Sequence, residues 1–171
     1  MGSGLKNVYV ASSAQLGAGW ALVSSQTFAA NSVTFSGLSG NYRYQAFLEC
    51  NQAGADATLY IYVNADTTDA HYYGQGITGD GAGVAAGRVN SPACGSISVG
   101  GAVGVYVATV SSGGYFCFQG TTNTPLSNAI KLDTRNGVKT DATISSITSI
   151  TFLSNAGTTS GTVKLYRVSV F

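Results

Sequence analysis

The stretch YRYQAFLEC, residues 42–50, alternates apolar and polar side chains. Successive side chains of a β-strand point to opposite faces of a sheet, so this alternation predicts a strand with one buried face. The residues predicted to face the interior are Tyr42, Tyr44, Ala46, Leu48 and Cys50. The opposite face carries three polar residues, Arg43, Gln45 and Glu49, with Phe47 among them.

The same pattern recurs along the chain, where runs rich in Val, Ile, Thr, Tyr and Phe are bounded by Gly, Asn, Ser and Asp. These residues are typical of strands and turns, and no segment shows the spacing of an amphipathic helix. The predicted strands are 20–28, 32–35, 42–50, 57–63, 71–74, 97–99, 103–110, 115–119, 130–133, 147–153 and 162–171. They predict an all-β fold, a two-sheet antiparallel β-sandwich of the jelly-roll kind.

The last predicted strand lies in GTVKLYRVSVF, residues 161–171. Val163 and Leu165 share one face, whereas Val168 and Val170 fall on the opposite face. Either a bulge near residues 166–167 shifts the alternation, or both faces of this strand are covered. In both cases the strand lies within a sheet.

We expect a single sandwich domain over residues 20–171, preceded by a flexible arm at residues 1–19. The arm contains only the short apolar run Val8, Tyr9 and Val10. Residues 74–95, GQGITGDGAGVAAGRVNSPACG, are rich in Gly and Ala and are predicted to form a long surface loop. We expect both the arm and this loop to contact capsid or sister subunits.

Charged residues make up 9% of the chain, against a typical value of about 25%, and the net charge is +1. The surface is therefore covered by neutral polar groups or by other subunits. The charge balance excludes a nucleic-acid partner, and no apolar run approaches the ~20 residues of a membrane-spanning helix. Cys50, Cys94 and Cys117 are predicted to be free thiols, and the N-terminus does not resemble a secretory signal, so we expect folding in a reducing cytosol.

Residues suited to catalysis are few. Glu49 is the only Glu and His71 the only His. Glu49 is predicted to form a surface ion pair with Arg43, although a hydrolase that pairs Glu49 with an Asp stays a minor alternative. The protein is predicted to be no enzyme and to need no cofactor.

The segment NADTTDAH, residues 64–71, is the candidate for a metal site. Asn64, Asp66 and Asp69 can offer oxygen ligands to Ca²⁺, but the closing bidentate Glu of a calcium loop is missing. A tight turn with local side-chain bonds explains the same residues, and we predict no metal.

Four tyrosines lie on two neighbouring segments: Tyr60, Tyr62, Tyr72 and Tyr73. Tyrosine buries a large area at an interface and keeps a polar tip. These rings are therefore candidates for an interface or a ligand-binding surface. The alternative is that they cap the edge of the sandwich.

Two stretches resemble a β-sandwich domain of tailed-bacteriophage virion proteins. The first is WALVSSQTF followed by SVTFSGL and YRYQAFL, and the second is ITSITFL followed by GTVKLYRV. In the second stretch the matching positions are Ile147, Ile150, Phe152, Gly161, Leu165 and Tyr166. The resemblance covers about a third of the chain and implies a jelly-roll module of head-decoration, fibre or tail-tip proteins, often homotrimeric. It implies no catalytic residue.

The leading hypothesis is a non-enzymatic virion protein, a capsid decoration or cement protein that binds sister subunits and the major capsid protein. Such a protein is made in the host bacterial cytoplasm and is located in the virion. The alternative hypothesis is a receptor- or carbohydrate-binding module at a tail or fibre tip, which stacks host-surface glycans on the four tyrosines.

Overall fold

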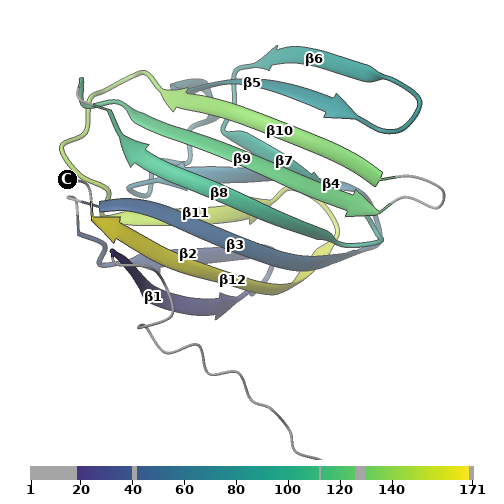
Figure 1. Ribbon diagram of the computed structural model, residues 1–171, viewed down its shortest axis with the longest axis horizontal. Helices are drawn as coiled ribbons and strands as arrows, with labels where there is room; N and C mark the ends of the chain where they lie inside the picture. Colours follow the sequence, from purple (N-terminus) through teal and green to yellow (C-terminus); the bar gives the residue numbers. More distant parts are fainter. Residues whose placement is uncertain (1–18, 40–41, 112, 126–129, 170–171) are drawn as a thin grey trace, which may run out of the picture.

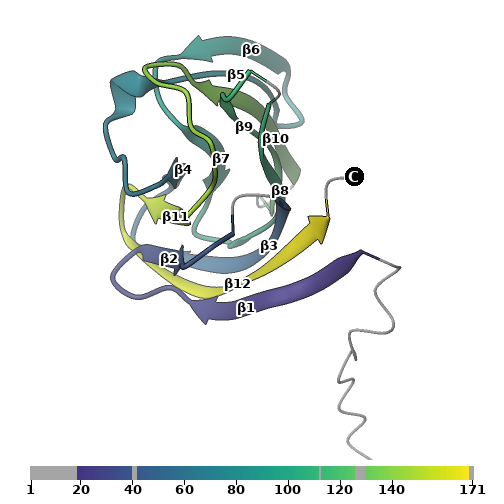
Figure 2. The same ribbon diagram turned by 90° about the vertical axis from the view of Figure 1, so that its left-hand side faces the viewer.

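A computed structural model of the chain describes residues 19–39, 42–111, 113–125 and 130–169. The larger of its two antiparallel sheets contains, in spatial order, β1 (Trp20–Thr27), β12 (Thr158–Ser169), β3 (Tyr42–Ala53), β8 (Ala102–Val110), β9 (Phe116–Pro125), β10 (Ile130–Lys139), β5 (Tyr72–Gly79) and β6 (Val84–Val89). The smaller contains β2 (Ser32–Ser36), β11 (Ser149–Ser154), β4 (Ala57–Val63) and β7 (Ala93–Ile97). One short 3₁₀ turn, η1 (Asp69–His71), precedes β5. The sheets pack face to face (Figures 1 and 2).

The strand pairing is that of a jelly roll, in which a long antiparallel ribbon folds over on itself. Four nested pairs form this ribbon: β1 with β12, β2 with β11, β3 with β8, and β4 with β7. The remaining strands, β9, β10, β5 and β6, extend the larger sheet from β8. The predicted all-β sandwich of jelly-roll type is confirmed.

The core lies between the two sheets and follows the predicted alternation. On β3, Tyr44, Ala46, Leu48 and Cys50 are buried, and Phe47 is exposed on the opposite face. Leu59 and Ile61 of β4 meet them from the smaller sheet, both fully buried. Each such aliphatic side chain stabilises the fold by about 1.5–3 kcal/mol when it leaves water.

Two aromatic rings of the larger sheet lie over glycines directly opposite them on the next strand. Tyr106 faces Gly120, and Phe118 faces Gly137. A Cβ at Gly120 would lie 2.3 Å from Cδ1 of Tyr106, and one at Gly137 would lie 2.1 Å from Cζ of Phe118. These positions need glycine because each ring fills the space of a side chain.

The predicted loop at residues 74–95 is wrong over most of its length, because this segment contains most of β5, all of β6 and the start of β7. Strand β5 pairs with β10 along its whole length, from Tyr72 opposite Lys139 to Gly79 opposite Leu132. Backbone pairing to an existing sheet edge supplies the order that the Gly- and Ala-rich side chains do not. The β5–β6 hairpin lies at the edge of the larger sheet (Figure 1).

The C-terminal strand β12 lies between β1 and β3, with Val163 and Leu165 buried. Its register with β3 is continuous from Thr158 to Ser169, so the bulge near residues 166–167, one of the two alternatives for this strand, is absent there. The irregularity lies on the neighbouring strand instead, between Leu22 and Ser24 of β1.

The three cysteines are free, as predicted. Burial raises the pKa of the Cys50 thiol to about 12, so it stays protonated in the core. The predicted arm, with Val8, Tyr9 and Val10, falls outside the described residues except for Gly19. Among the described residues, no helix is long and apolar enough to cross a membrane.

Candidate functional site

The four candidate tyrosines do not form one exposed surface. Tyr62 and Tyr72 are buried, whereas Tyr73 is 49% exposed. The Tyr62 ring packs against those of Tyr60 and Tyr72, with centroids 6.1 Å and 5.7 Å apart. Because Tyr72 and Tyr73 are successive strand residues, they point to opposite faces. The prediction of a four-tyrosine stacking surface is therefore wrong.

Tyr62 and Tyr72 are buried because the connection between β4 and β5 folds back over them. The hydroxyl of Tyr62 donates to Oδ1 of Asp69 at 2.7 Å. The hydroxyl of Tyr72 donates to the backbone carbonyl of Asp66 at 2.8 Å and accepts from the amide of Val63 at 3.1 Å. These bonds make the two rings part of the scaffold.

The candidate calcium ligands Asn64, Asp66 and Asp69 form hydrogen bonds that stabilise the connection between β4 and β5. Asn64 and Ala65 have positive φ angles of 54° and 60°, as a tight two-residue turn requires. Oδ1 of Asn64 accepts from the amide of Thr148 at 2.7 Å, and Oδ1 of Asp66 accepts from the amide of Thr68 at 3.1 Å. Asp69 bonds instead to Tyr62, so Asn64, Asp66 and Asp69 each bond to a different protein group. This favours the tight turn over a shared calcium site.

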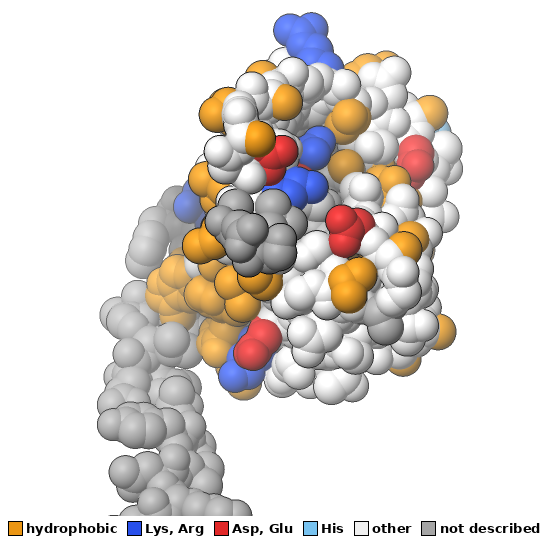
Figure 3. Space-filling view, turned by 90° about the vertical axis from the view of Figure 1, so that its right-hand side faces the viewer, with side chains coloured by type: hydrophobic (Ala, Val, Ile, Leu, Met, Phe, Trp, Pro, Cys, Tyr) orange, Lys and Arg blue, Asp and Glu red, His pale blue; other side chains and the backbone are white. Residues whose placement is uncertain are grey.

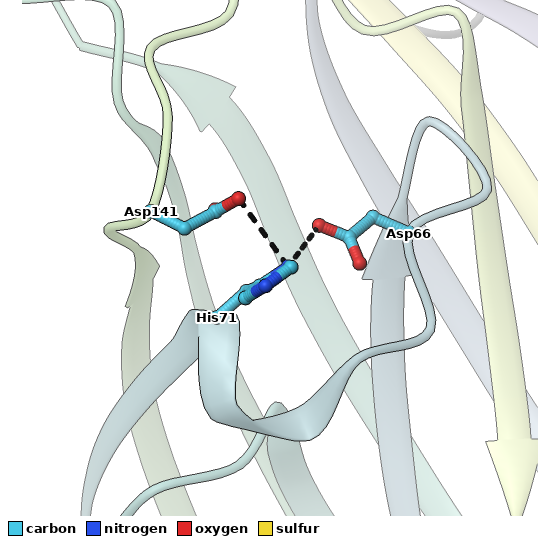
Figure 4. A group of neighbouring side chains, drawn as sticks. All are labelled: Asp66, His71 and Asp141. Carbon is cyan, nitrogen blue, oxygen red and sulfur yellow. Dashed lines mark hydrogen bonds and ion pairs between the residues drawn. The ribbon is translucent and has the colours of Figure 1, made fainter.

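A charged cluster that the sequence did not predict lies beside this turn. His71 Nδ1 is 2.8 Å from Oδ2 of Asp66 and 3.3 Å from Oδ2 of Asp141, which lie on opposite sides of the imidazole (Figure 4). Lys139 at the end of β10 bonds to Asp141 and places Nζ 2.9 Å from Oδ2 of Asp66. The pairing of β5 with β10 brings together residues that are distant in sequence.

Asp66, His71 and Asp141 place three potential metal ligands within 4.8 Å of one another. The Lys139 ammonium, however, bonds to both carboxylates, and its side chain is only 6% exposed. A metal ion would have to share these oxygens with a buried cation, which it strongly repels. The three ligand residues therefore do not fit a metal site. We name the ion-paired group of Asp66, His71, Lys139 and Asp141 the ionic clamp.

The titration of the ionic clamp agrees with these ion pairs. Burial alone would raise the pKa of Asp66, but hydrogen bonds from His71 and Lys139 more than offset it and hold that pKa well below its usual range. Burial lowers the pKa of Lys139, and the bonds to Asp141 and Asp66 reverse this and raise it. Both groups are held in their charged forms at neutral pH.

Glu49 does not form the predicted ion pair with Arg43. The two residues lie on the same face of β3, six positions apart, so their Cα atoms are about 20 Å apart. Glu49 is also absent from the one close group of three or more acidic, histidine or cysteine side chains among the described residues. Among the described residues, the two hollows that Glu49 lines contain no Asp, so nothing there supports the alternative of a Glu49 hydrolase.

The most unusual surface is the outer face of the larger sheet. Of the exposed large hydrophobic residues, Val99 and Tyr115 lie between strands, Val23 lies at the bulge of β1, and the others point outward from the larger sheet. Over β1, β12, β3 and β8 we define the apolar outer face by six residues: Trp20, Leu22, Phe47, Val103, Val105 and Tyr166. Hydrophobic side chains gather on this side of the molecule, at the left of Figure 3.

The outer face of the smaller sheet is different in kind. The outward residues of β2 and β11 are largely Ser and Thr, and Thr34 and Thr151 share a hydrogen bond of 2.9 Å between their hydroxyls, whereas β4 carries Tyr60 and Tyr62 on this face. An antiparallel sheet that faces water normally shows such a polar outer surface. The larger sheet departs from this pattern, because large apolar side chains are exposed on its outer face.

Phe47 lies beside a hollow of about 340 Å³ that Glu49, Val103, Val105 and Lys164 also line. Lys164 pairs in register with Phe47, and Glu49 lies two residues further along β3. One acid and one base thus flank an exposed ring on the apolar outer face.

Comparison with known proteins gives no match: no protein-family model, no curated protein and no solved structure matches the chain. The sequence did carry one signal of the apolar outer face, since Phe47 interrupts the polar positions of YRYQAFLEC.

Proposed function

We propose that this protein is a non-enzymatic structural subunit of a bacteriophage virion, a capsid decoration protein that assembles as a homo-oligomer. The observation that carries the proposal is the apolar outer face, since contiguous exposed apolar surface of this kind marks protein–protein contact sites. A trimer is the size favoured by the resemblance to phage virion domains.

A second copy of the chain suits the apolar outer face better than a charged partner. Glu49 and Lys164 lie on the same face with opposite charges, so copies can pair the acid of one with the base of the next. The net charge of only +1 gives little repulsion between copies. Symmetric assembly of this kind is the commonest form of oligomer.

The fold is compatible with the proposed setting. Jelly rolls occur in viral capsid proteins and in lectins, although a fold alone does not define a function. The ionic clamp adds support for a non-enzymatic role, because its His, Asp and Lys side chains are bonded to one another.

The proposal is tested by locating the protein on the particle. Capsids assembled without the protein are mixed with the purified full chain and imaged by electron microscopy. Extra density at regular positions of the capsid lattice is expected. Absence from both the lattice and the native particle would refute the virion role.

A further inference from the structure

The outer face of the larger sheet has a second half with a different character. Asn136 of β10, Gln75 of β5 and Arg88 of β6 lie directly opposite one another in register, all exposed. Neighbouring strands are about 4.8 Å apart, so this row of polar side chains spans roughly 10 Å across the sheet. We name these three residues the polar row.

The polar row has unused hydrogen-bonding capacity. Within the part of the chain that the structure describes, no side-chain hydrogen bond or ion pair uses Gln75, Arg88 or Asn136. Arg135, next to Asn136, points to the other face and places Nε 2.6 Å from Oδ1 of Asp133. Arg88 is therefore a cation without a protein counter-ion in the described residues.

A groove runs along the polar row beside an aromatic ring. The groove has a volume of about 530 Å³, and its walls include Tyr73, Gln75, Arg88, Asn90 and Asn136. It continues into a second hollow of about 480 Å³ that Ile77, Ala86 and Thr134 line together with the polar row. Tyr73, the one candidate tyrosine with a large exposed area, thus stands at the groove wall.

We infer that this groove binds an acidic saccharide, a glycan whose sugar rings carry carboxylates. The amides of Gln75, Asn90 and Asn136 offer donors and acceptors together, which matches sugar hydroxyls. The face of Tyr73 offers an apolar platform for the C–H side of a sugar ring. The Arg88 guanidinium can bond a carboxylate with two parallel hydrogen bonds, which a neutral sugar does not exploit.

This binding site does not depend on the proposed assembly. The groove lies over β10, β5 and β6, whereas the apolar outer face lies over β1, β12, β3 and β8. Strand β9 separates the two halves (Figure 1). Oligomers formed through the apolar outer face leave the groove at the periphery.

The test is a glycan array probed with the full chain, with uronic-acid oligosaccharides and their neutral counterparts printed side by side. We expect binding to acidic members above their neutral counterparts. For the strongest member, titration calorimetry should show at least tenfold weaker binding for Arg88→Gln and for Tyr73→Ala. Raising the salt concentration should weaken the binding of the parent chain more than that of Arg88→Gln.

Matched controls separate the site from general damage. Arg43→Gln and Tyr115→Ala remove an exposed arginine and a 42% exposed tyrosine elsewhere, and both should bind as the parent chain does. Circular dichroism confirms that every variant is folded, and light scattering on the same samples reports assembly separately. No binding, binding of neutral members only, or binding unchanged in both groove variants would overturn the inference.

Discussion

Phe47 and Tyr166 meet edge to face on the outer side of the larger sheet, with ring centroids 5.5 Å apart and ring planes at 90°. Tyr166 also contacts Trp20, at 6.5 Å between centroids. Each ring restricts its neighbour before any partner arrives, so less side-chain entropy is lost on association. These three aromatic rings are therefore preorganised for the proposed association of copies.

Trp20 is the only tryptophan in the chain, so its fluorescence reports directly on the apolar outer face. We predict that emission shifts to shorter wavelength and that acrylamide quenching weakens as the protein concentration rises through the assembly range. The physical reason is that a second copy removes water from the indole. Emission and quenching independent of concentration, in samples whose mass changes, would place the contact elsewhere.

The ionic clamp should be sensitive to loss of its lysine. Lys139→Met leaves Asp66 and Asp141 without their shared cation, and because these carboxylates are 20% and 29% exposed the loss should be about 1–3 kcal/mol, less than for a fully buried pair. Urea denaturation measures the free energy of unfolding. Lys131→Met on the same strand is the control, because no ion pair within the described residues includes Lys131, and its effect should stay within about 0.5 kcal/mol. Equal effects would show that the clamp contributes nothing.

The clamp also predicts a pH window. The lowered pKa of Asp66 stabilises the fold above the unfolded value of about 3.9, and this contribution is lost as pH falls through the folded-state pKa. The raised pKa of Lys139 stabilises below the unfolded value of about 10.4 and is lost as pH rises through the folded-state pKa. The contributions of Asp66 and Lys139 to stability should therefore both be present in full from about pH 5 to pH 9, with the first lost below this window and the second above it.

The dependence of stability on pH below about pH 5 distinguishes the clamp from other titrating groups. In Lys139→Met, the pKa of Asp66 should return toward its usual value, so unfolding midpoints in urea should fall less steeply between pH 5 and pH 2 than in the parent chain. The alkaline side is shared with buried tyrosines such as Tyr72, whose pKa burial raises. An acid slope identical in both proteins would contradict the assignment.

Packing of Tyr106 over Gly120 makes that glycine intolerant of a side chain. Gly120→Ala should destabilise the fold by about 1–3 kcal/mol, because the new methyl group overlaps the ring. Gly87→Ala in β6 is the matched control, since a Cβ there meets no atom within 4 Å. Thermal or urea unfolding of both variants measures the difference. Similar losses at the two positions would contradict the role of the ring.

Jelly-roll strands such as β3, β4 and β8 could be predicted from the sequence because each has a buried face that the alternation of apolar and polar residues reveals, whereas β7 was predicted in large part as loop. Strand β6 could not, because Val84–Val89 is almost wholly exposed and carries no inward pattern. Its order comes from backbone pairing with β5. Because the Gly- and Ala-rich segment has no buried face, its composition alone predicts a loop.

The candidate sites show the same limit. In LYIYV, residues 59–63, alternation places Tyr62 on the face opposite Leu59 and Ile61, but it does not show that the turn before β5 folds over the ring and bonds it to Asp69. The ionic clamp was invisible because His71 and Lys139 meet only through the pairing of β5 with β10. Long-range strand pairing decides both cases, and no short motif encodes it.

Association of copies of this chain through the apolar outer face is tested by the variant Phe47→Glu, which places a charge at the exposed ring of that face. Mass is measured by light scattering during size-exclusion chromatography, with Thr34→Glu on the smaller sheet as the control for added charge. We expect an oligomer for the parent chain and for Thr34→Glu, and a folded monomer of 17.4 kDa for Phe47→Glu. A monomeric parent chain, or a Phe47→Glu variant that keeps the parent mass, would contradict association through this face.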